Sequence, residues 1–126
     1  MLENHPDIDK SKVHTQGGSY GGFMSAIFGT RYPEMFKTAT ILNGVINFPA
    51  NLWFADIPEW NTVETLGKEQ FHELTAEDYQ AMWRQSPGNQ PMKIPTLQFL
   101  GAKDRRVPWR QGLFFDAITK ESGVSI

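Results

Sequence analysis

The sequence contains no cysteine in its 126 residues. This absence excludes disulfides, thiolate nucleophiles, cysteine-containing zinc sites and cysteine-ligated iron–sulfur clusters, and it fits a reducing compartment. No apolar run reaches the roughly 18 residues of a membrane-spanning helix, and residues 1–7 lack the order of a signal peptide. The net charge is only −2, which gives no electrostatic reason to expect nucleic acid or a membrane as partner. We therefore expect a cytoplasmic protein.

The order of apolar residues and helix breakers predicts strands that alternate with helices. Short β-branched runs favour strands at 12–16, 38–42 and 95–100, and apolar residues one helical turn apart favour helices at 23–31 and 110–122. The aromatic-rich stretch 44–94 has little strand character and is interpreted as a mostly helical insertion, in which Thr75 and Asp78 form an N-terminal cap. Strands separated by helices indicate a parallel sheet, so the expected fold class is α/β.

The expected sheet is thin. Its first strand would lie at an edge with nothing outside it, and natural domains usually cover such an edge. We therefore expect further sheet upstream of this segment in the native protein. The last residues, 124–126, are expected to begin another strand.

The strongest chemical signal is a serine between glycines at the turn from the first strand to the first helix. Residues 17–21, G-G-S-Y-G, have the G-x-S-x-G pattern of a nucleophile elbow in the strand-to-helix context that this motif requires. The flanking Gly17 and Gly21 lack β-carbons that would collide with the neighbouring backbone. The following helix points its free N–H groups at Ser19, so the Tyr20 backbone N–H can stabilise an oxyanion. The alternative is that Ser19 only caps the helix.

A serine nucleophile needs a base, and the base needs a carboxylate that orients it. In α/β-hydrolases these residues follow in the chain order Ser, Asp or Glu, His. Asp104 comes just after the third expected strand, at the same carboxyl edge of the sheet as Ser19. Arg105 and Arg106 are expected to help keep it ionised. The alternative is an ordinary aspartate in a loop turn.

The third member of such a triad has no candidate in this sequence. All the histidines precede Asp104, at positions His5, His14 and His72. We expect His14 in a strand and His72 on a solvent-facing part of the insertion. The spacing of His5, Asp7 and Asp9 is compatible with a metal site, but a polar turn is favoured. We predict no metal and no cofactor.

Several segments together resemble one enzyme family. They are G-G-S-Y-G-G-F at 17–23, Y-P-E at 32–34, D-I-P-E-W at 56–60, S-P at 86–87 and G-A-K-D-R-R-V-P at 101–108. In combination they resemble the catalytic domain of acylaminoacyl-peptidases, which are serine peptidases of the prolyl oligopeptidase family. The resemblance runs from about residue 12 to the end of the sequence.

This resemblance implies that residues 1–126 are part of an α/β-hydrolase domain, which in the family usually follows a β-propeller. It implies a peptidase that removes N-acylated amino acids from short peptides through an acyl-enzyme on Ser19, with Asp104 as the triad acid. The family's histidine would come about ten positions after Ile126, beyond one more strand. The chain would then lack its base, the first half of the sheet and the loop with the second oxyanion N–H, and would be inactive alone. Homo-oligomerisation of the full-length protein is left open.

Residues 45–60 follow the second expected strand, where the family has the pocket for the residue before the cleaved bond. Phe48, Trp53 and Trp60 are candidates for this pocket, although a core role is favoured for buried aromatic residues. Two alternatives stay open for the function. One is a truncated, inactive fragment or isoform. The other is a different serine hydrolase, such as an esterase or dipeptidyl-peptidase, which should lack the paired motifs at 56–60 and 104–108.

Overall fold

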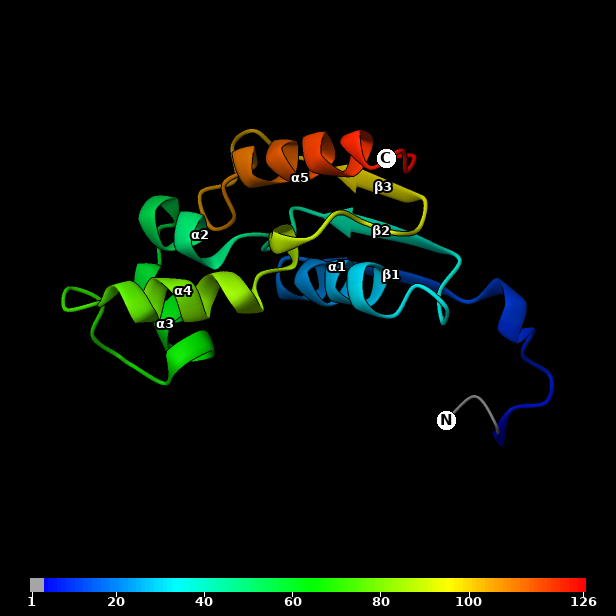
Figure 1. Cartoon of the computed structure of the whole chain (residues 1–126), viewed down its shortest axis with the longest axis horizontal. Helices are drawn as coiled ribbons and strands as arrows, with labels where there is room; N and C mark the ends of the chain where they lie inside the picture. Colours follow the sequence, from blue (N-terminus) through cyan, green and yellow to red (C-terminus); the bar gives the residue numbers. More distant parts are fainter. Residues whose placement is uncertain (1–3) are drawn as a thin grey trace.

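A short parallel sheet with helices forms the centre of the computed structural model, which describes residues 4–126 (Figure 1). Strands β1 (His14–Gly18), β2 (Thr38–Leu42) and β3 (Thr96–Phe99) lie side by side in that order. Both strand pairs are parallel, and Gly18, Leu42 and Phe99 lie at matching positions near the carboxyl ends. The α/β class and the parallel sheet are therefore confirmed.

Helices α1 (Tyr20–Arg31) and α5 (Arg110–Glu121) cover one face of this sheet. The strand residues Ala39 and Ile41 point to that face and pack with Ala26 of α1 and Phe115 of α5 in one hydrophobic cluster. Each of these side chains is almost completely buried, which is the main favourable contribution to holding helix on sheet. None of the helices in the described part of the chain is long and apolar enough to cross a membrane.

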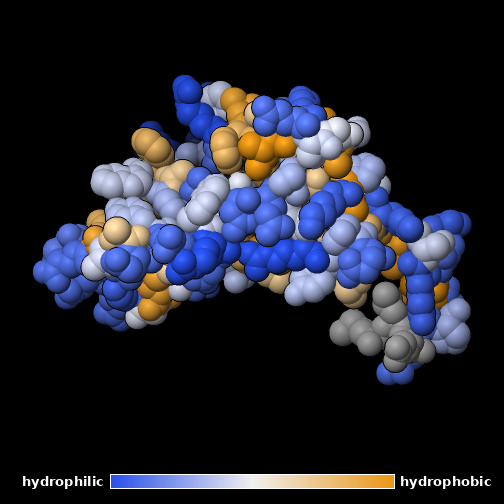
Figure 2. Space-filling model, viewed as in Figure 1, coloured by the Kyte–Doolittle hydropathy of each residue, from blue (hydrophilic) through white to orange (hydrophobic). Residues whose placement is uncertain are grey.

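Hydrophobic side chains stay uncovered on the opposite face of the sheet and on α5. Leu42, Leu97 and Phe99 point away from α1 and α5 and are 40%, 54% and 53% exposed. Figure 2 shows hydrophobic atoms gathered over α5, where Leu113 and Phe114 are about half exposed. Parallel sheets are normally covered on both faces, whereas within the described residues helices cover only one face of this sheet.

The stretch between β2 and β3 forms the predicted helical insertion. It contains α2 (Phe48–Phe54), α3 (Pro58–Leu66), α4 (Ala76–Gln85) and a 3-10 turn, η3 (Pro87–Asn89). In Figure 1 these green helices lie beyond the carboxyl ends of the strands. Thr75 and Asp78 form a reciprocal capping box at the start of α4, as predicted. A second hydrophobic cluster, made of Val45, Phe48, Leu52, Met82 and Val107, joins the insertion to the strand ends.

Two expected boundaries differ from the structure. The helix after the elbow begins at Tyr20 and not at residue 23, because the chain turns at a single residue, Ser19, and enters the helix directly. The expected strand at 124–126 is wrong, since these residues form no strand. One backbone hydrogen bond joins them to the sheet, from the Thr96 amide to the Ser125 carbonyl at 3.0 Å. A strand pair needs a series of such hydrogen bonds.

Candidate active site

Ser19 lies at the sharp turn between β1 and α1. Its backbone angles, φ 55° and ψ −120°, fall in a region that non-glycine residues rarely adopt. Three backbone bonds hold it there: its amide donates to the Leu42 carbonyl at 3.0 Å, and its carbonyl accepts from the amides of Phe23 and Val45. The side chain is exposed and makes no capping hydrogen bond, which argues against the alternative that Ser19 only caps the helix.

The glycines around Ser19 permit this turn, although not in the symmetric way that the motif suggests. A β-carbon on Gly17 would overlap the backbone carbonyl of Gly21, and one on Gly22 would lie 2.6 Å from the Gly44 α-carbon. A β-carbon on Gly21 would meet nothing within 4 Å in the described structure. The expectation that Gly21 is needed to avoid a collision is therefore wrong for these residues, and Gly22 takes that part.

The start of α1 carries Tyr20, whose backbone amide is predicted to be the oxyanion donor. Tyr20 is the first residue of the helix, and its backbone N–H has no acceptor among the described residues. Free amides at a helix N-terminus carry partial positive charge, which favours a negative oxygen nearby. Because Tyr20 follows Ser19 directly, its amide is positioned to bind an oxyanion that forms when the serine attacks a carbonyl.

Asp104 lies in the loop that follows β3, two strands away from the elbow. Its Oδ1 accepts from the backbone amides of Arg106 and Val107, both at 2.9 Å, and its Oδ2 accepts from the Asn43 side-chain amide at 2.5 Å. Partial burial raises the pKa of Asp104, but these hydrogen bonds and the Arg106 charge outweigh burial and hold the pKa below its ordinary value. Asp104 is therefore held as a carboxylate. Arg106 contributes as expected, whereas Arg105 does not.

Asn43 is a site residue that the sequence analysis missed. It follows β2, between the strand ends that carry Ser19 and Asp104, and its φ of 40° is positive. Among the described residues only Ser19 and Asn43 combine a side chain with a positive φ. The sequence Asn43-Gly44 predicts only a place for the chain to turn. Asparagine is also one of the non-glycine residues that most readily adopt a positive φ.

A small pocket of about 270 Å³ opens beside Ser19. Its walls come from the elbow, the loop after β2, the insertion and the Asp104 loop, and are formed by Ser19, Tyr20, Val45, Asn51, Ile57, Trp60, Arg106 and Val107. The Tyr20 ring stacks on Phe23 and meets the edge of Trp60, with ring centroids 5.1 Å and 5.8 Å apart. The Ser19 hydroxyl therefore lies next to a partly aromatic wall.

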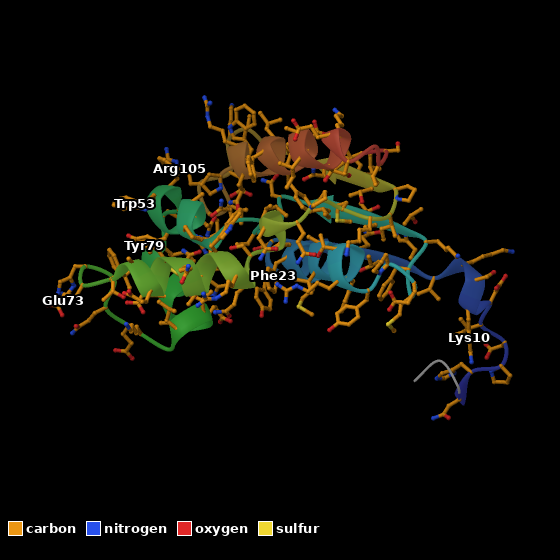
Figure 3. All side chains as sticks on the ribbon, viewed as in Figure 1. Lys10, Phe23, Trp53, Glu73, Tyr79 and Arg105 are labelled. Carbon is orange, nitrogen blue, oxygen red and sulfur yellow. The ribbon has the colours of Figure 1, made fainter. Side chains whose placement is uncertain are left out.

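The three aromatic residues considered for this pocket lie in different surroundings. Phe48 is buried in the second hydrophobic cluster, which agrees with the favoured core role. Trp60 packs on the same cluster and also lines the pocket. Trp53 does not line this pocket; it is 70% exposed and stacks on Tyr79, with ring centroids 6.4 Å apart, and Figure 3 labels both residues.

The two motifs at 56–60 and 104–108 meet in the structure. The Arg106 guanidinium donates to the Asp56 carboxylate at 2.6 Å, and the Asp56 amide donates to the Arg105 carbonyl at 3.0 Å. This pairing raises the pKa of Arg106 and ties the start of α3 to the loop that carries Asp104. The pairing brings the two motifs into direct contact.

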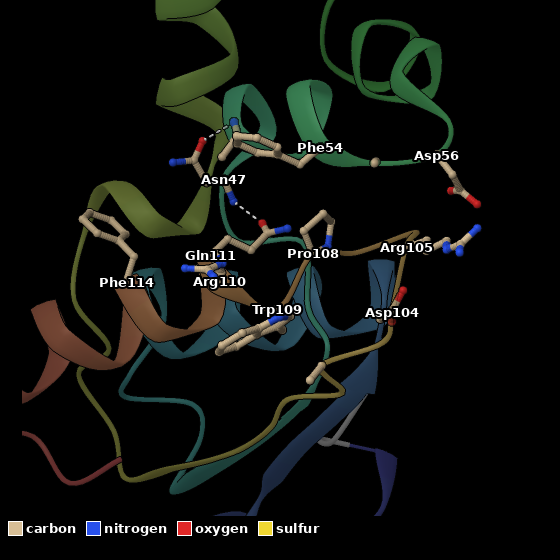
Figure 4. A pocket seen from close by; sticks show the side chains of 13 residues that line it. Asn47, Phe54, Asp56, Asp104, Arg105, Pro108, Trp109, Arg110, Gln111 and Phe114 are labelled. Carbon is tan, nitrogen blue, oxygen red and sulfur yellow. Dashed lines mark hydrogen bonds between the residues drawn. The ribbon is translucent and has the colours of Figure 1, made fainter.

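A larger hollow of about 600 Å³ lies on another side of Asp104. In Figure 4 Asp104, Asp56 and Arg105 lie at one side of it and Phe114 at the other. The buried Gln111 carbonyl accepts from the Ile46 and Asn47 amides, and its amide donates to Asn51. These bonds join α5 to the loop that leads into the insertion.

The described residues place Ser19, the Tyr20 amide and Asp104 at one edge of the sheet, and no histidine forms a hydrogen bond with Ser19 or Asp104 there. His14 begins β1, so about 13 Å of strand separates it from the elbow, and its ring bonds to Thr38 and Thr40 on the open face. His72 lies in an exposed turn of the insertion, beside Glu73. Asp9, one of the residues weighed as a metal ligand, accepts from Ser11 and caps a short 3-10 turn, η2 (Lys10–Lys12).

A serine in a strained turn between a parallel strand and a helix, with an aspartate after the strand two positions away in the sheet, is the arrangement expected around the nucleophile of an α/β-hydrolase. The model of the prolyl oligopeptidase family matches residues 1–125. The chain belongs to this family.

Individual relatives agree with this assignment. The chain is 41% identical over 123 residues to acylamino-acid-releasing enzyme 1 of Oryza sativa subsp. japonica, with 93% of this chain and 16% of that protein covered. It is 32% identical over 135 residues to the acylamino-acid-releasing enzyme of Homo sapiens, with 100% and 17% covered. The Pyrococcus horikoshii acylaminoacyl peptidase structure superposes with a TM-score of 0.81 at 28% identity, over 98% of this chain and 19% of that one. The chain thus spans about one sixth of the length of these curated relatives.

Proposed function

We propose that the native polypeptide containing these residues is a serine peptidase that releases N-acylated amino acids from the ends of short peptides. The observation that carries this proposal is the strained Ser19, whose exposed side chain makes no capping hydrogen bond, at one strand end with the ionised Asp104 two strands away. Membership of the prolyl oligopeptidase family and the names of the similar enzymes support the reaction class.

The chemistry assigns one step to each group. The Ser19 Oγ attacks the carbonyl carbon of the substrate while its proton passes to a histidine base, and the carbonyl oxygen becomes an oxyanion that accepts from the Tyr20 amide. When the C–N bond breaks, the histidine returns the proton to the leaving amine, and water then hydrolyses the acyl-enzyme by the same route. Asp104 orients the histidine and stabilises its charged form. No histidine follows Asp104 in this sequence, so the proposal requires one from outside these residues.

The pocket beside Ser19 supports a place for the side chain that precedes the cleaved bond. Its volume of about 270 Å³ and its Trp60 and Tyr20 walls suit an apolar or aromatic side chain. One similar structure, at 28% identity and a TM-score of 0.80, is an acylaminoacyl peptidase in complex with Z-Gly-Gly-Phe-chloromethyl ketone. A cytoplasmic location and homo-oligomerisation stay predictions.

A second candidate is a truncated product without catalytic activity. Loss of a triad base lowers turnover by about a million-fold in a serine hydrolase, so these 126 residues by themselves, which contain no histidine after Asp104, should not turn over substrate.

Fluorophosphonate labelling of the native source extract separates these two candidates. Labelled proteins are resolved by size, and the segment 17–23 is identified by peptide mapping. Labelling of Ser19 in a chain much larger than 14.3 kDa, together with release of acetyl-alanine from an acetylated peptide but not from its free-amine form, supports the peptidase. A Ser19→Ala variant is the control and should lose both signals. Recovery of the segment only in an unlabelled chain of about 14.3 kDa would contradict the peptidase proposal.

A further inference from the structure

The side chain of Asn43 connects the start of the loop after β3 to Asp104 within that loop. Its Oδ1 accepts from the Gly101 amide at 2.6 Å, and its Nδ2 donates to the Asp104 Oδ2 at 2.5 Å. Its backbone amide donates to the Phe99 carbonyl at 2.9 Å, which continues the sheet pairing up to the loop. One residue after the central strand thus holds both the start of the loop and the carboxylate in the middle of it.

The hydrogen bonds of Asp104 divide unequally between its two oxygens. Oδ1 already accepts two backbone amides, from Arg106 and Val107, and each carboxylate oxygen has about two lone-pair positions. Oδ2 accepts only from Asn43 in the described structure and keeps one position for a further donor. That position is the one that a histidine N–H can use. The contact with Asn43 therefore sets the direction of the remaining acceptor site.

Asparagine suits this place for two separate reasons. It tolerates the positive φ that the chain adopts as it leaves β2. Its amide offers a donor and an acceptor together, whereas aspartate offers acceptors only when ionised. The neutral donor bonds to the carboxylate without adding a charge that would compete with the histidine for it.

We propose that Asn43 is a positioning residue of the catalytic acid: its side-chain amide orients the Asp104 carboxylate so that Oδ2 receives the N–H of the histidine base. This inference rests on the proposed function, because it has catalytic meaning only if Asp104 is the triad acid. In the described structure the Asn43 side chain bonds to Gly101 and Asp104 and not to Ser19, so it acts through Asp104.

The experiment measures kcat and KM for acetyl-alanyl p-nitroanilide, the rate of fluorophosphonate labelling and the thermal midpoint in the native polypeptide. Asn43→Asp keeps an acceptor for the Gly101 amide and removes the donor to Asp104. Asn43→Gly keeps the backbone conformation and removes both bonds. Asn89→Asp is the matched control, because Asn89 also donates through Nδ2, to the Trp83 and Arg84 carbonyls of the insertion, away from the strand ends.

We expect kcat to fall by on the order of tenfold in Asn43→Gly and further in Asn43→Asp, with KM within twofold and slower labelling. The loss should stay below the roughly 10⁴-fold loss caused by neutralising a triad acid. Asn89→Asp should change the midpoint and not kcat. A wild-type kcat in both Asn43 variants would overturn this inference alone. So would an equal fall of kcat in Asn89→Asp when its thermal midpoint changes by the same amount as that of the Asn43 variants. A wild-type polypeptide that is neither labelled nor active would overturn the proposed function as well.

Discussion

Substitution of Gly17 by alanine tests how the elbow is built. The added β-carbon would lie 2.8 Å from the Gly21 α-carbon and closer still to the Gly21 carbonyl. These are backbone atoms, which cannot rotate away as the end of a side chain can. We therefore expect a destabilisation of about 3 kcal/mol, at the upper end of the range for overpacking. For a chain of this length, that corresponds to a drop in the thermal midpoint of roughly 10–15 °C.

Gly21→Ala is the control for Gly17→Ala in the same motif. Its β-carbon meets nothing within 4 Å, and alanine is a better helix former than glycine by up to about 1 kcal/mol. We expect its midpoint to equal or exceed that of the wild type. Thermal unfolding of the 126-residue chain can be followed by the fluorescence of its 4 tryptophans. Equal midpoints for the two variants would refute the reasoning that the Gly17 backbone contact decides the geometry of the turn.

Further substitutions test the acid, the buried network and the insertion. The pKa of Asp104 is lower in the folded state than its ordinary value, so the ionised carboxylate stabilises the fold above about pH 5. This contribution to the free energy of unfolding is lost as the pH falls through 3.8 and below. In Asp104→Asn the free energy of unfolding should therefore depend less on pH in this range. An unchanged acid-unfolding curve would contradict that assignment. Gln111→Leu leaves the Ile46 and Asn47 amides without their acceptor and should cost about 2–4 kcal/mol in urea unfolding, where a loss under about 1 kcal/mol would count against the network. Thr75→Ala removes one half of the capping box and should cost about 1 kcal/mol, recovered in part by Thr75→Ser.

The sequence predicts the sheet and the insertion well because their signals are local. The β-branched run at 38–42 coincides with β2, and the capping residue Thr75 marks the start of α4. The start of α1 is predicted three residues late because a helix that begins Tyr20-Gly21-Gly22 has poor local propensity. Tertiary contacts override that propensity, since Gly22 allows α1 to pack closely on Gly44 after β2.

The residues of the site also differ in whether local or long-range features of the sequence could reveal them. Ser19 and Asp104 are found from motifs and strand ends, both of which are short-range features of the sequence. Asn43 is missed because its partner lies 61 residues away and no pattern joins them. The same holds for Gln111, whose buried side chain reaches backbone amides 64 and 65 residues away. Such contacts depend on which strands become neighbours, and spacing along the chain does not reveal that.

The described structure also places its unusual backbone geometry at one edge of the sheet. Ser19 and Asn43 end adjacent parallel strands and are the non-glycine residues with positive φ. Strained conformations persist only where surrounding bonds enforce them, and here the pairing of Ser19 with Leu42 and of Asn43 with Phe99 does so. Each strained residue is thus held by the next strand in the order β1, β2, β3. A substitution that weakens the pairing of β3 should therefore displace Asp104 and Asn43 first and affect Ser19 only through β2. The central strand is thus the structural connection between Ser19 and Asp104.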